Sequence, residues 1–304
     1  MQSIDSFTLE LGASSEIALA LSLSTMMFAV ALGLKVEHFK FIQTQPRIYF
    51  AGVLGQVIGL PLLTLLLCFM VNPMPSVALG MILVACCPGG NVSNTFVLLS
   101  RGNTALSVSL TATSSLLAAF VTPLSVVFWC QLYPPTARLL NDINFDVLRF
   151  LLQTTALLFI PLALGMLTGN KLEHLAQRIQ KPLVFISSSI LLGIIIISNI
   201  HYIDAFIDAG IVLLVMLIIH NALAFLLGNG LARLVKTDLS KRIAMTYEIG
   251  IQNSGLAIVI LLTQLGGLGG AAIVVGFWGT WHIIAGIILM LWYRYTQQVE
   301  KMTV

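Results

Sequence analysis

A single acidic side chain, Glu248, stands inside an otherwise apolar stretch and is followed by amides and glycines in residues 248–255 (EIGIQNSG). An ionised group at the bilayer centre costs roughly 2.5–3.5 kcal/mol even on the lenient insertion scale, so such a group usually has a function. Glu248 and Gln252 are four residues apart and share one helical face. Because hard cations prefer carboxylate and amide oxygens, we predict a cation site. Sodium, a proton, and a protonated acid with a purely structural hydrogen bond are all compatible with the residue types.

A second polar interruption lies at residues 86–94 (CCPGGNVSN). Pro88 removes a backbone donor and the two glycines after it loosen the helix, so carbonyl and N–H groups lose their partners within the helix. A helix broken at mid-membrane offers carbonyl oxygens to a cation and a positive half-helix N-terminus to an anion. Ser107 and Thr111 follow at a spacing of four, on one face of the next apolar segment. Bonding of these hydroxyls to their own helix is the alternative interpretation.

The chain around these polar segments has the composition of a polytopic membrane protein. Its 304 residues are 58% hydrophobic and 9% charged, and about nine apolar segments are long enough to cross a hydrocarbon core. The segments are 15–34, 46–71, 76–100, 104–131, 146–168, 181–200, 206–235, 241–265 and 270–293. The two polar interruptions fall in the third and eighth segments, which run in opposite directions through the membrane. This favours an all-α transporter with inverted repeats and two crossed, broken helices.

Charge in the connecting segments predicts the orientation of the chain. Basic residues gather on alternate loops and at the C-terminus, whereas the other face keeps most of the acidic ones. The positive-inside rule then puts the C-terminus in the cytoplasm and the N-terminus outside. We expect a multi-pass protein of the cell membrane, or of the inner membrane in a bacterium. The basic residues report orientation and not a nucleic-acid partner, and membrane lipid is the expected surrounding. Residues 1–304 form a single domain, and the oligomeric state is left open.

Several function classes lack their motifs in this sequence. There is no His-Glu-x-x-His, no pair of membrane aspartates and no Gly-x-Ser-x-Gly, which argues against an intramembrane enzyme. A passive channel would need a repeated filter motif or a ring of like charges, and neither occurs. The four cysteines lack metal-ligand spacing and are expected to be small buried side chains. A proton-coupled carrier that uses Glu248 remains the nearest rival to a sodium-coupled one.

Other polar positions in the apolar segments have two interpretations each. Gln56 lies between two glycines, where it could pack between helices or face a site. His220 and Asn221 could titrate or bond across helices, and His282 could be a packed neutral histidine or a pocket residue.

Two long motifs in the same order resemble the bile acid:sodium symporter family. They are residues 88–94 (PGGNVSN), with 101–103 (RGN) and 105–107 (ALS), and residues 248–257 (EIGIQNSGLA), with Trp281-His282. The similarity extends from about residue 15 to 293. It implies sodium-coupled uptake of an organic anion, bile acid-like or a small carboxylate, by alternating access between a core and a panel domain. Asn91 replaces a common Thr, and Ile283 follows His282 where bacterial members often have Asn.

The resemblance also implies which residues bind ions and substrate. One sodium site would comprise Ser93, Asn94, Ser107, Thr111 and Glu248. A second would comprise Gln56, Glu248, Gln252 and the carbonyls of Ile249 and Ile251. The organic anion would lie near Asn91, Asn253 and His282. The core would include residues 76–131 and 206–265, and the panel residues 15–71, 146–200 and 270–293.

Overall fold

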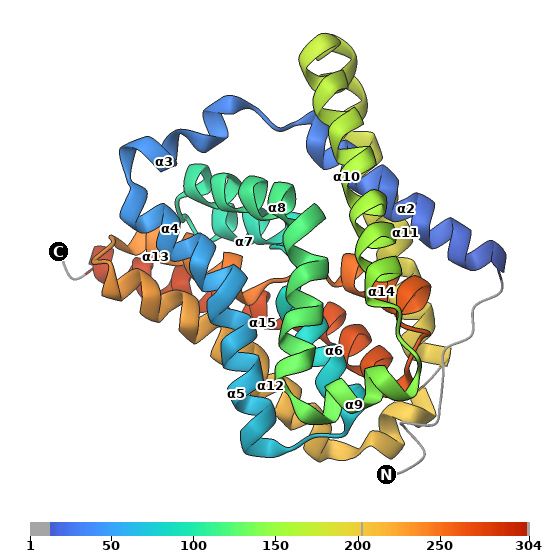
Figure 1. Cartoon of the computed structure of the whole chain (residues 1–304). Helices are drawn as coiled ribbons and strands as arrows, with labels where there is room; N and C mark the ends of the chain where they lie inside the picture. The colour runs from blue at the N-terminus through green and yellow to red at the C-terminus, as the bar shows by residue number, and fades with distance from the viewer. Residues whose placement is uncertain (1–12, 202, 303–304) are drawn as a thin grey trace.

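The structure, a computed structural model, describes residues 13–201 and 203–302, and this portion of the chain is helical almost throughout (Figure 1). Its elements are α2 (Ala13–Leu32), η1 (Val36–Phe39), α3 (Lys40–Thr44), α4 (Pro46–Leu54), η2 (Gly55–Gly59), α5 (Leu60–Val71), α6 (Pro75–Cys86), α7 (Asn91–Leu99), α8 (Thr104–Leu132), α9 (Pro134–Asp142), α10 (Val147–Lys171), α11 (Glu173–His201), α12 (Ile203–Leu234), α13 (Leu239–Gly250), α14 (Ser254–Gln264) and α15 (Gly269–Met302). No strand occurs among the described residues, which confirms the all-α class. Asp5 and Glu10, assigned to the outer face, lie outside the described residues.

Five of the described helices are long and apolar enough to cross a membrane. They are Pro46–Val71, Thr104–Leu132, Val147–Lys171, Gly210–Leu234 and Gly269–Val299. A bent pair at 17–32 and 37–44 raises the number to six, and the shorter apolar helices α6 and α14 are halves of the two broken segments. The polytopic membrane class is therefore confirmed, and the count of about nine spans stays a prediction.

Three helices, α2, α10 and α11, pack side by side and form a layer on the right of Figure 1. We call them the three-helix layer. A Cβ atom at Gly165 of α10 would lie 2.4 Å from the carbonyl oxygen of Phe28 in α2, so only glycine permits this approach. Small residues are the usual means by which membrane helices pack this closely.

The other long helices surround the two broken ones. α12 packs along α13, α15 packs along α6 and α14, and the α4–η2–α5 segment contacts α8 and α12. All four cysteines are free and buried here, which confirms their assignment as buried side chains. These contacts associate residues 46–71 and 270–293 with the broken helices, whereas the sequence analysis grouped them with the panel. The grouping that we propose below follows the contacts.

The first broken helix is interrupted by its own sequence. α6 ends at Cys86, and Cys87 and Gly90 both have extended backbone conformations. Pro88 between them has no N–H group with which to continue the helix. α7 then begins at Asn91 without a side-chain cap, so its first N–H groups remain available to other partners.

The second broken helix contains no proline at its break. α13 ends at Gly250, and its terminal carbonyl accepts a 2.8 Å hydrogen bond from the Asn221 amide of α12. The Oδ1 atom of Asn253 accepts a 3.0 Å bond from the Leu256 N–H and caps α14. These two asparagines stabilise the end of α13 and the start of α14. The break therefore does not depend on a proline in the local sequence.

A π turn, η2, separates α4 from α5 within one continuous segment and contains Gln56. Pro61 follows it and cannot donate a backbone hydrogen bond back into the preceding turn, which favours a wider turn at this point. The widened turn leaves Gln56 buried and directed towards the broken helices.

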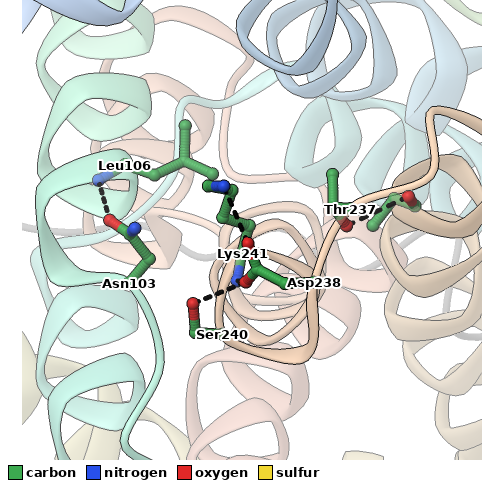
Figure 2. A network of polar contacts seen from close by, with 7 residues as sticks. Asn103, Leu106, Thr237, Asp238, Ser240 and Lys241 are labelled. Carbon is green, nitrogen blue, oxygen red and sulfur yellow. Dashed lines mark hydrogen bonds and ion pairs between the residues drawn. The ribbon is translucent and has the colours of Figure 1, made fainter. Parts of the chain in front are cut away.

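The loops that precede α8 and α13 are joined at one end of the molecule. Asn103 caps α8 through a 2.9 Å bond from the Leu106 N–H, and Asp238 caps α13 through a 3.0 Å bond from the Lys241 N–H (Figure 2). The Asn103 N–H donates to the Ser240 carbonyl at 2.8 Å. Hydrogen bonds from the Lys241 ammonium and the Ser240 hydroxyl hold the pKa of Asp238 well below its ordinary value.

Candidate functional site

The extended links of the two broken helices cross as a short antiparallel bridge. The Gly90 N–H donates to the Ile251 carbonyl at 3.2 Å, and the Asn253 N–H donates to the Pro88 carbonyl at 2.9 Å. Backbone groups that the breaks release must find partners inside a membrane protein. Because the two links supply these partners to each other, they fix the crossing that the sequence predicted.

Glu248 lies beside this crossing and is completely buried. The Ser93 hydroxyl of α7 donates to its Oε2 atom at 2.8 Å, and the Thr111 hydroxyl of α8 lies 2.9 Å from both carboxylate oxygens. Side chains from α7, α8 and α13 therefore converge on one carboxylate.

Asn94 and Ser107 extend this group of oxygens. The Ser107 hydroxyl donates to Asn94 Oδ1 at 2.7 Å, and the Thr111 hydroxyl lies 3.3 Å from the same Oδ1 and 3.0 Å from the Ser107 carbonyl. The five side chains expected at the first sodium site thus form one connected cluster, which we call the Glu248 cluster: Ser93, Asn94, Ser107, Thr111 and Glu248.

Acceptors outnumber protons in the Glu248 cluster. Its three hydroxyls and the Asn94 amide supply about five protons. An ionised carboxylate alone offers about four acceptor positions, and the lone pairs of the Asn94 and Ser107 carbonyl oxygens raise the number above that of the protons. Among the described residues, neither of the ion pairs present involves Glu248. A buried carboxylate without a cation is unfavourable, so this arrangement would be stabilised by a hard cation held by oxygens.

The residues expected at the second sodium site are also neighbours. The Gln56 Nε2 donates to Gln252 Oε1 at 3.3 Å, and the Gln252 Nε2 donates to the Ile249 carbonyl at 2.8 Å. The Ile251 carbonyl accepts the bond from Gly90 described above. A cation that bound the Ile249 carbonyl would take the place of the Gln252 amide, so this group must rearrange more than the Glu248 cluster.

Gly89 lies between the two groups of oxygens. A Cβ atom at this position would lie 2.2 Å from Glu248 Oε1 and 3.3 Å from Gln56 Nε2. The missing side chain therefore allows the carboxylate and the first link to approach each other.

A cavity of about 820 Å³ separates the three-helix layer from α7 and α8. Asn91, Asn94 and Thr111 line it on the side of the broken helix, so it reaches the Glu248 cluster. Phe185 and Val184 of α11 contribute an apolar wall on the opposite side. A cavity with one polar end and an apolar body is typical of small-molecule sites.

The three residues expected to bind substrate do not all reach this cavity. Asn91 lines it, whereas Asn253 caps α14 and His282 is buried in α15 with 3% of its surface exposed. Neither Asn253 nor His282 lines the cavity, so their predicted contact with substrate stays a prediction.

Two polar residues that the sequence left open bond across helices. The Thr64 hydroxyl lies 2.8 Å from the Leu60 carbonyl and 2.7 Å from His220 Nε2, so a hydrogen bond links α5 to α12. Asn221 binds the Gly250 carbonyl at the end of α13.

Sequence reasoning assigned no binding role to Lys181, although within the described portion of the chain it is the one charged side chain that lines the cavity. The signal was its basic character at the start of an apolar segment, which was used only to predict orientation.

Comparison with known proteins agrees with the family resemblance of the two sequence motifs. A family model described as "Sodium Bile acid symporter family" matches residues 20–209, which is more than half of the chain. The uncharacterized sodium-dependent transporter YocS of Bacillus subtilis is 30% identical over 281 residues, or 92% of this chain and 83% of the relative.

Plant and animal relatives are similar over most of the chain. A probable chloroplastic sodium/metabolite cotransporter, BASS1 of Oryza sativa, is 30% identical over 83% of this chain. The chain spans 60% of the length of that relative. The human ileal sodium/bile acid cotransporter is 26% identical over 80% of this chain and 68% of the relative.

Proposed function

Because the chain belongs to the sodium bile acid symporter family, we propose that it imports an organic anion together with sodium by alternating access. The family consists of transporters and not enzymes. The names of the relatives describe sodium-dependent transport, sodium/metabolite cotransport and sodium/bile acid cotransport. We transfer the coupling ion from these names to this chain as an element of the proposal.

The observation that carries the proposal is the Glu248 cluster. It joins a buried carboxylate from one broken helix to hydroxyl and amide oxygens from the other and from α8. Acceptors exceed donors there, and oxygen is the ligand type that hard cations select. Sodium bound in this cluster would compensate the buried charge of Glu248.

We assign two sodium sites that share Glu248. The first is the Glu248 cluster, and the second forms when the Gln252 amide turns and releases the Ile249 carbonyl. Its remaining ligands would be Gln56, the carboxamide oxygen of Gln252 and the Ile251 carbonyl. Since the first site joins α13 to α7 and the second includes the link after α13, sodium binding fixes α7 and α13 relative to each other.

The organic anion would bind at the start of α7, where Asn91 lines the 820 Å³ cavity. The uncapped N–H groups of this half-helix favour negative charge. Asn253 and His282 would join the site only after a rearrangement that opens the crossing. Because sodium orders the links and positions these N–H groups, ions and substrate bind cooperatively.

The energetics favour import. Two sodium ions and a monovalent anion carry one net positive charge, which a potential of 100 mV drives with roughly 2.3 kcal/mol. The sodium concentration gradient contributes in addition. An ion-to-substrate ratio of two thus couples transport to both gradients.

For alternating access we assign α2, α10 and α11 to one moving unit and the remaining long helices to the other. The cavity lies where Gly33 and Lys181 approach the basic loops of the predicted cytoplasmic face. We therefore interpret the arrangement as an inward-open state, with the C-terminus in the cytoplasm.

Uptake into proteoliposomes tests the proposal. Radiolabelled taurocholate and pantoate, one amphipathic and one small carboxylate, should accumulate when external choline is replaced by sodium. Glu248→Gln should abolish this sodium-dependent accumulation, because it removes the charge but retains the shape.

A proton-coupled carrier would give a different result. Its uptake would follow an inward proton gradient and persist in choline. Accumulation without sodium would therefore contradict the sodium assignment while leaving the transporter class intact.

A further inference from the structure

Two adjoining cavities lie at the opposite end of the boundary between the moving units. They have volumes of about 730 and 380 Å³ and share four lining residues. These are Arg149 and Gln153 of α10, and Thr263 and Gln264 at the end of α14. We call this combined space the Arg149 cavity, with a larger and a smaller chamber. It lies at the start of α10, whereas the 820 Å³ cavity lies beside the start of α11.

The charge of the larger chamber comes from one of the described side chains. Among the residues that the structure describes, Arg149 is the only charged one that lines the larger chamber, and Asp146 lines only the smaller chamber. The carboxylate of Asp146 accepts the backbone N–H of Arg149 at 3.0 Å and caps α10. Within the described residues of the chain, the Arg149 guanidinium forms no ion pair or hydrogen bond. A permanently charged fork with five donors therefore faces an open cavity.

The walls of the cavity complement this charge. Leu157, Ile160 and Leu164 give the larger chamber an apolar side. The Thr263 hydroxyl donates to the Val259 carbonyl at 2.8 Å and accepts from the Gln264 Nε2 at 3.4 Å, and Gln153 and Gln264 add carboxamides. A guanidinium beside carboxamides and an apolar wall suits an organic acid with an apolar body.

The same combination occurs at the other end of the boundary. In the 820 Å³ cavity, Lys181 is the only charged side chain among the described residues of the lining, and Phe185 and Val184 supply apolar surface. In both cavities the basic residue comes from the three-helix layer and faces the second half of a broken helix, α7 or α14. The two ends of the proposed transport route thus offer an anion similar surroundings.

We propose that the Arg149 cavity is a second binding site for organic anions, in which Arg149 binds the acid group. It is separate from the site proposed above at Asn91 in the 820 Å³ cavity. Its role as the first contact of an imported anion on the outer face rests on the proposed function. The binding site itself does not depend on sodium or on the direction of transport.

Charge-selective labelling of a cysteine in the cavity tests the site directly. Ala156 is two helical turns after Arg149 and lines the larger chamber, and all four native cysteines are buried. In purified Ala156→Cys protein in nanodiscs, the probes are an anionic sulfonatoethyl and a cationic trimethylammonioethyl methanethiosulfonate. At low salt, the ratio of anionic to cationic labelling rates should fall about threefold in the Arg149→Gln background.

Matched variants separate this effect from a general change of the surface. Arg149→Lys should restore the ratio, because it keeps the charge. Arg138→Gln should leave it unchanged, since Arg138 belongs to α9 and lines neither chamber of the cavity. Millimolar taurocholate should slow labelling of Ala156→Cys by about threefold or more, and Arg149→Gln should remove that protection.

Equal rate ratios with and without Arg149 would overturn the proposal, and so would taurocholate protection that survives Arg149→Gln. A guanidinium already paired with a lipid phosphate would give equal rate ratios. Sodium-driven uptake together with a labelling-rate ratio that does not depend on Arg149 would reject only the Arg149 site. Charge-selective labelling without sodium-driven uptake would reject the proposed function and retain the site.

Discussion

The two broken helices reach the same crossing by different means. The first is interrupted by Pro88 and two glycines, which cannot continue a stable membrane helix. The second is interrupted where Asn221 takes the last carbonyl of α13 and Asn253 caps α14. One break is therefore encoded locally, and the other depends on tertiary contacts.

The two regions also differ in their exposure. Asn91 and Asn94 of α7 are partly exposed and line the 820 Å³ cavity, whereas residues 243–262 of α13 and α14 are buried throughout. The first broken helix thus offers its N-terminus to a ligand, and the second carries the carboxylate. This division suggests that substrate specificity and ion binding can be altered separately.

The largest expected effect comes from Glu248→Gln, which removes the charge that both proposed sodium sites share. Removing one partner of a buried charge pair costs about 3–5 kcal/mol, so sodium affinity should fall at least about 100-fold. Sodium-dependent thermal stabilisation of the purified protein measures this loss, with choline as the reference.

Variants that alter only one of the two proposed sodium sites sharpen the comparison. Thr111→Val should remove the first sodium site and Gln252→Ala the second, so each should lower the Hill coefficient for sodium from about 2 towards 1. Coefficients that stay near the wild-type value would show that the two groups of oxygens do not bind separate ions.

The next largest effect is expected for Gly89→Ala. The added Cβ would lie 2.2 Å from Glu248 Oε1, so the carboxylate or the link must move. Overpacking of this kind costs about 1–3 kcal/mol, which corresponds to a loss in sodium affinity of about 5- to 150-fold.

Gly90→Ala is the matched control, because its Cβ would meet the Gln252 carbonyl oxygen at 3.4 Å and leave the carboxylate untouched. Equal sodium affinities of the two variants, measured by the same thermal shift, would refute the proposed role of Gly89.

Much of this arrangement could be predicted from the sequence. Pro88 and Glu248 marked the two interruptions, and the four-residue spacing of Ser107 and Thr111 indicated a shared face. The structure brings Ser107, Thr111 and Glu248 into one cluster. Local chemistry was sufficient here because helix breakers and charged groups are rare in apolar segments.

Features that depend on packing could not be predicted in the same way. The contacts that associate residues 46–71 and 270–293 with the broken helices, and the position of Lys181 at a cavity, follow from how helices meet. Apolar segments have similar compositions on every face, so sequence periodicity does not identify their neighbours.

A smaller effect, on stability, should distinguish the asparagine cap of α14 from that of α8. Asn253→Ala leaves a completely buried Leu256 N–H without its acceptor, whereas Asn103→Ala affects a cap that is only half-buried. An unpaired buried donor costs about 1–3 kcal/mol, and an ordinary cap about 1 kcal/mol. The apparent melting temperature should therefore fall further for Asn253→Ala. The reverse order would mean that the second break is held by contacts other than its cap.

The smallest expected effect is at Asp238, where the α13 cap is exposed and its energy is screened by water. Asp238→Ala should lower stability at pH 7 by about 0.5–1 kcal/mol, and Asp238→Asn by less, because asparagine also caps helices. The folded state holds the pKa of Asp238 below its ordinary value through Lys241 and Ser240. Its contribution is therefore complete above the unfolded-state pKa of about 4 and decreases as the pH falls below it.

The difference in melting temperature between wild type and Asp238→Ala should accordingly be constant from pH 7 to about pH 5 and shrink towards pH 3. A difference that grows on acidification would contradict the ion pair with Lys241. Because Asn103 binds the Ser240 carbonyl beside this cap, a loss of sodium affinity in Asp238→Ala would show that the joined loops transmit strain to the crossing. Unchanged sodium affinity would show that the Asp238 cap contributes to stability alone. The start of α13 would then have no influence on the sodium sites beside the break between α13 and α14.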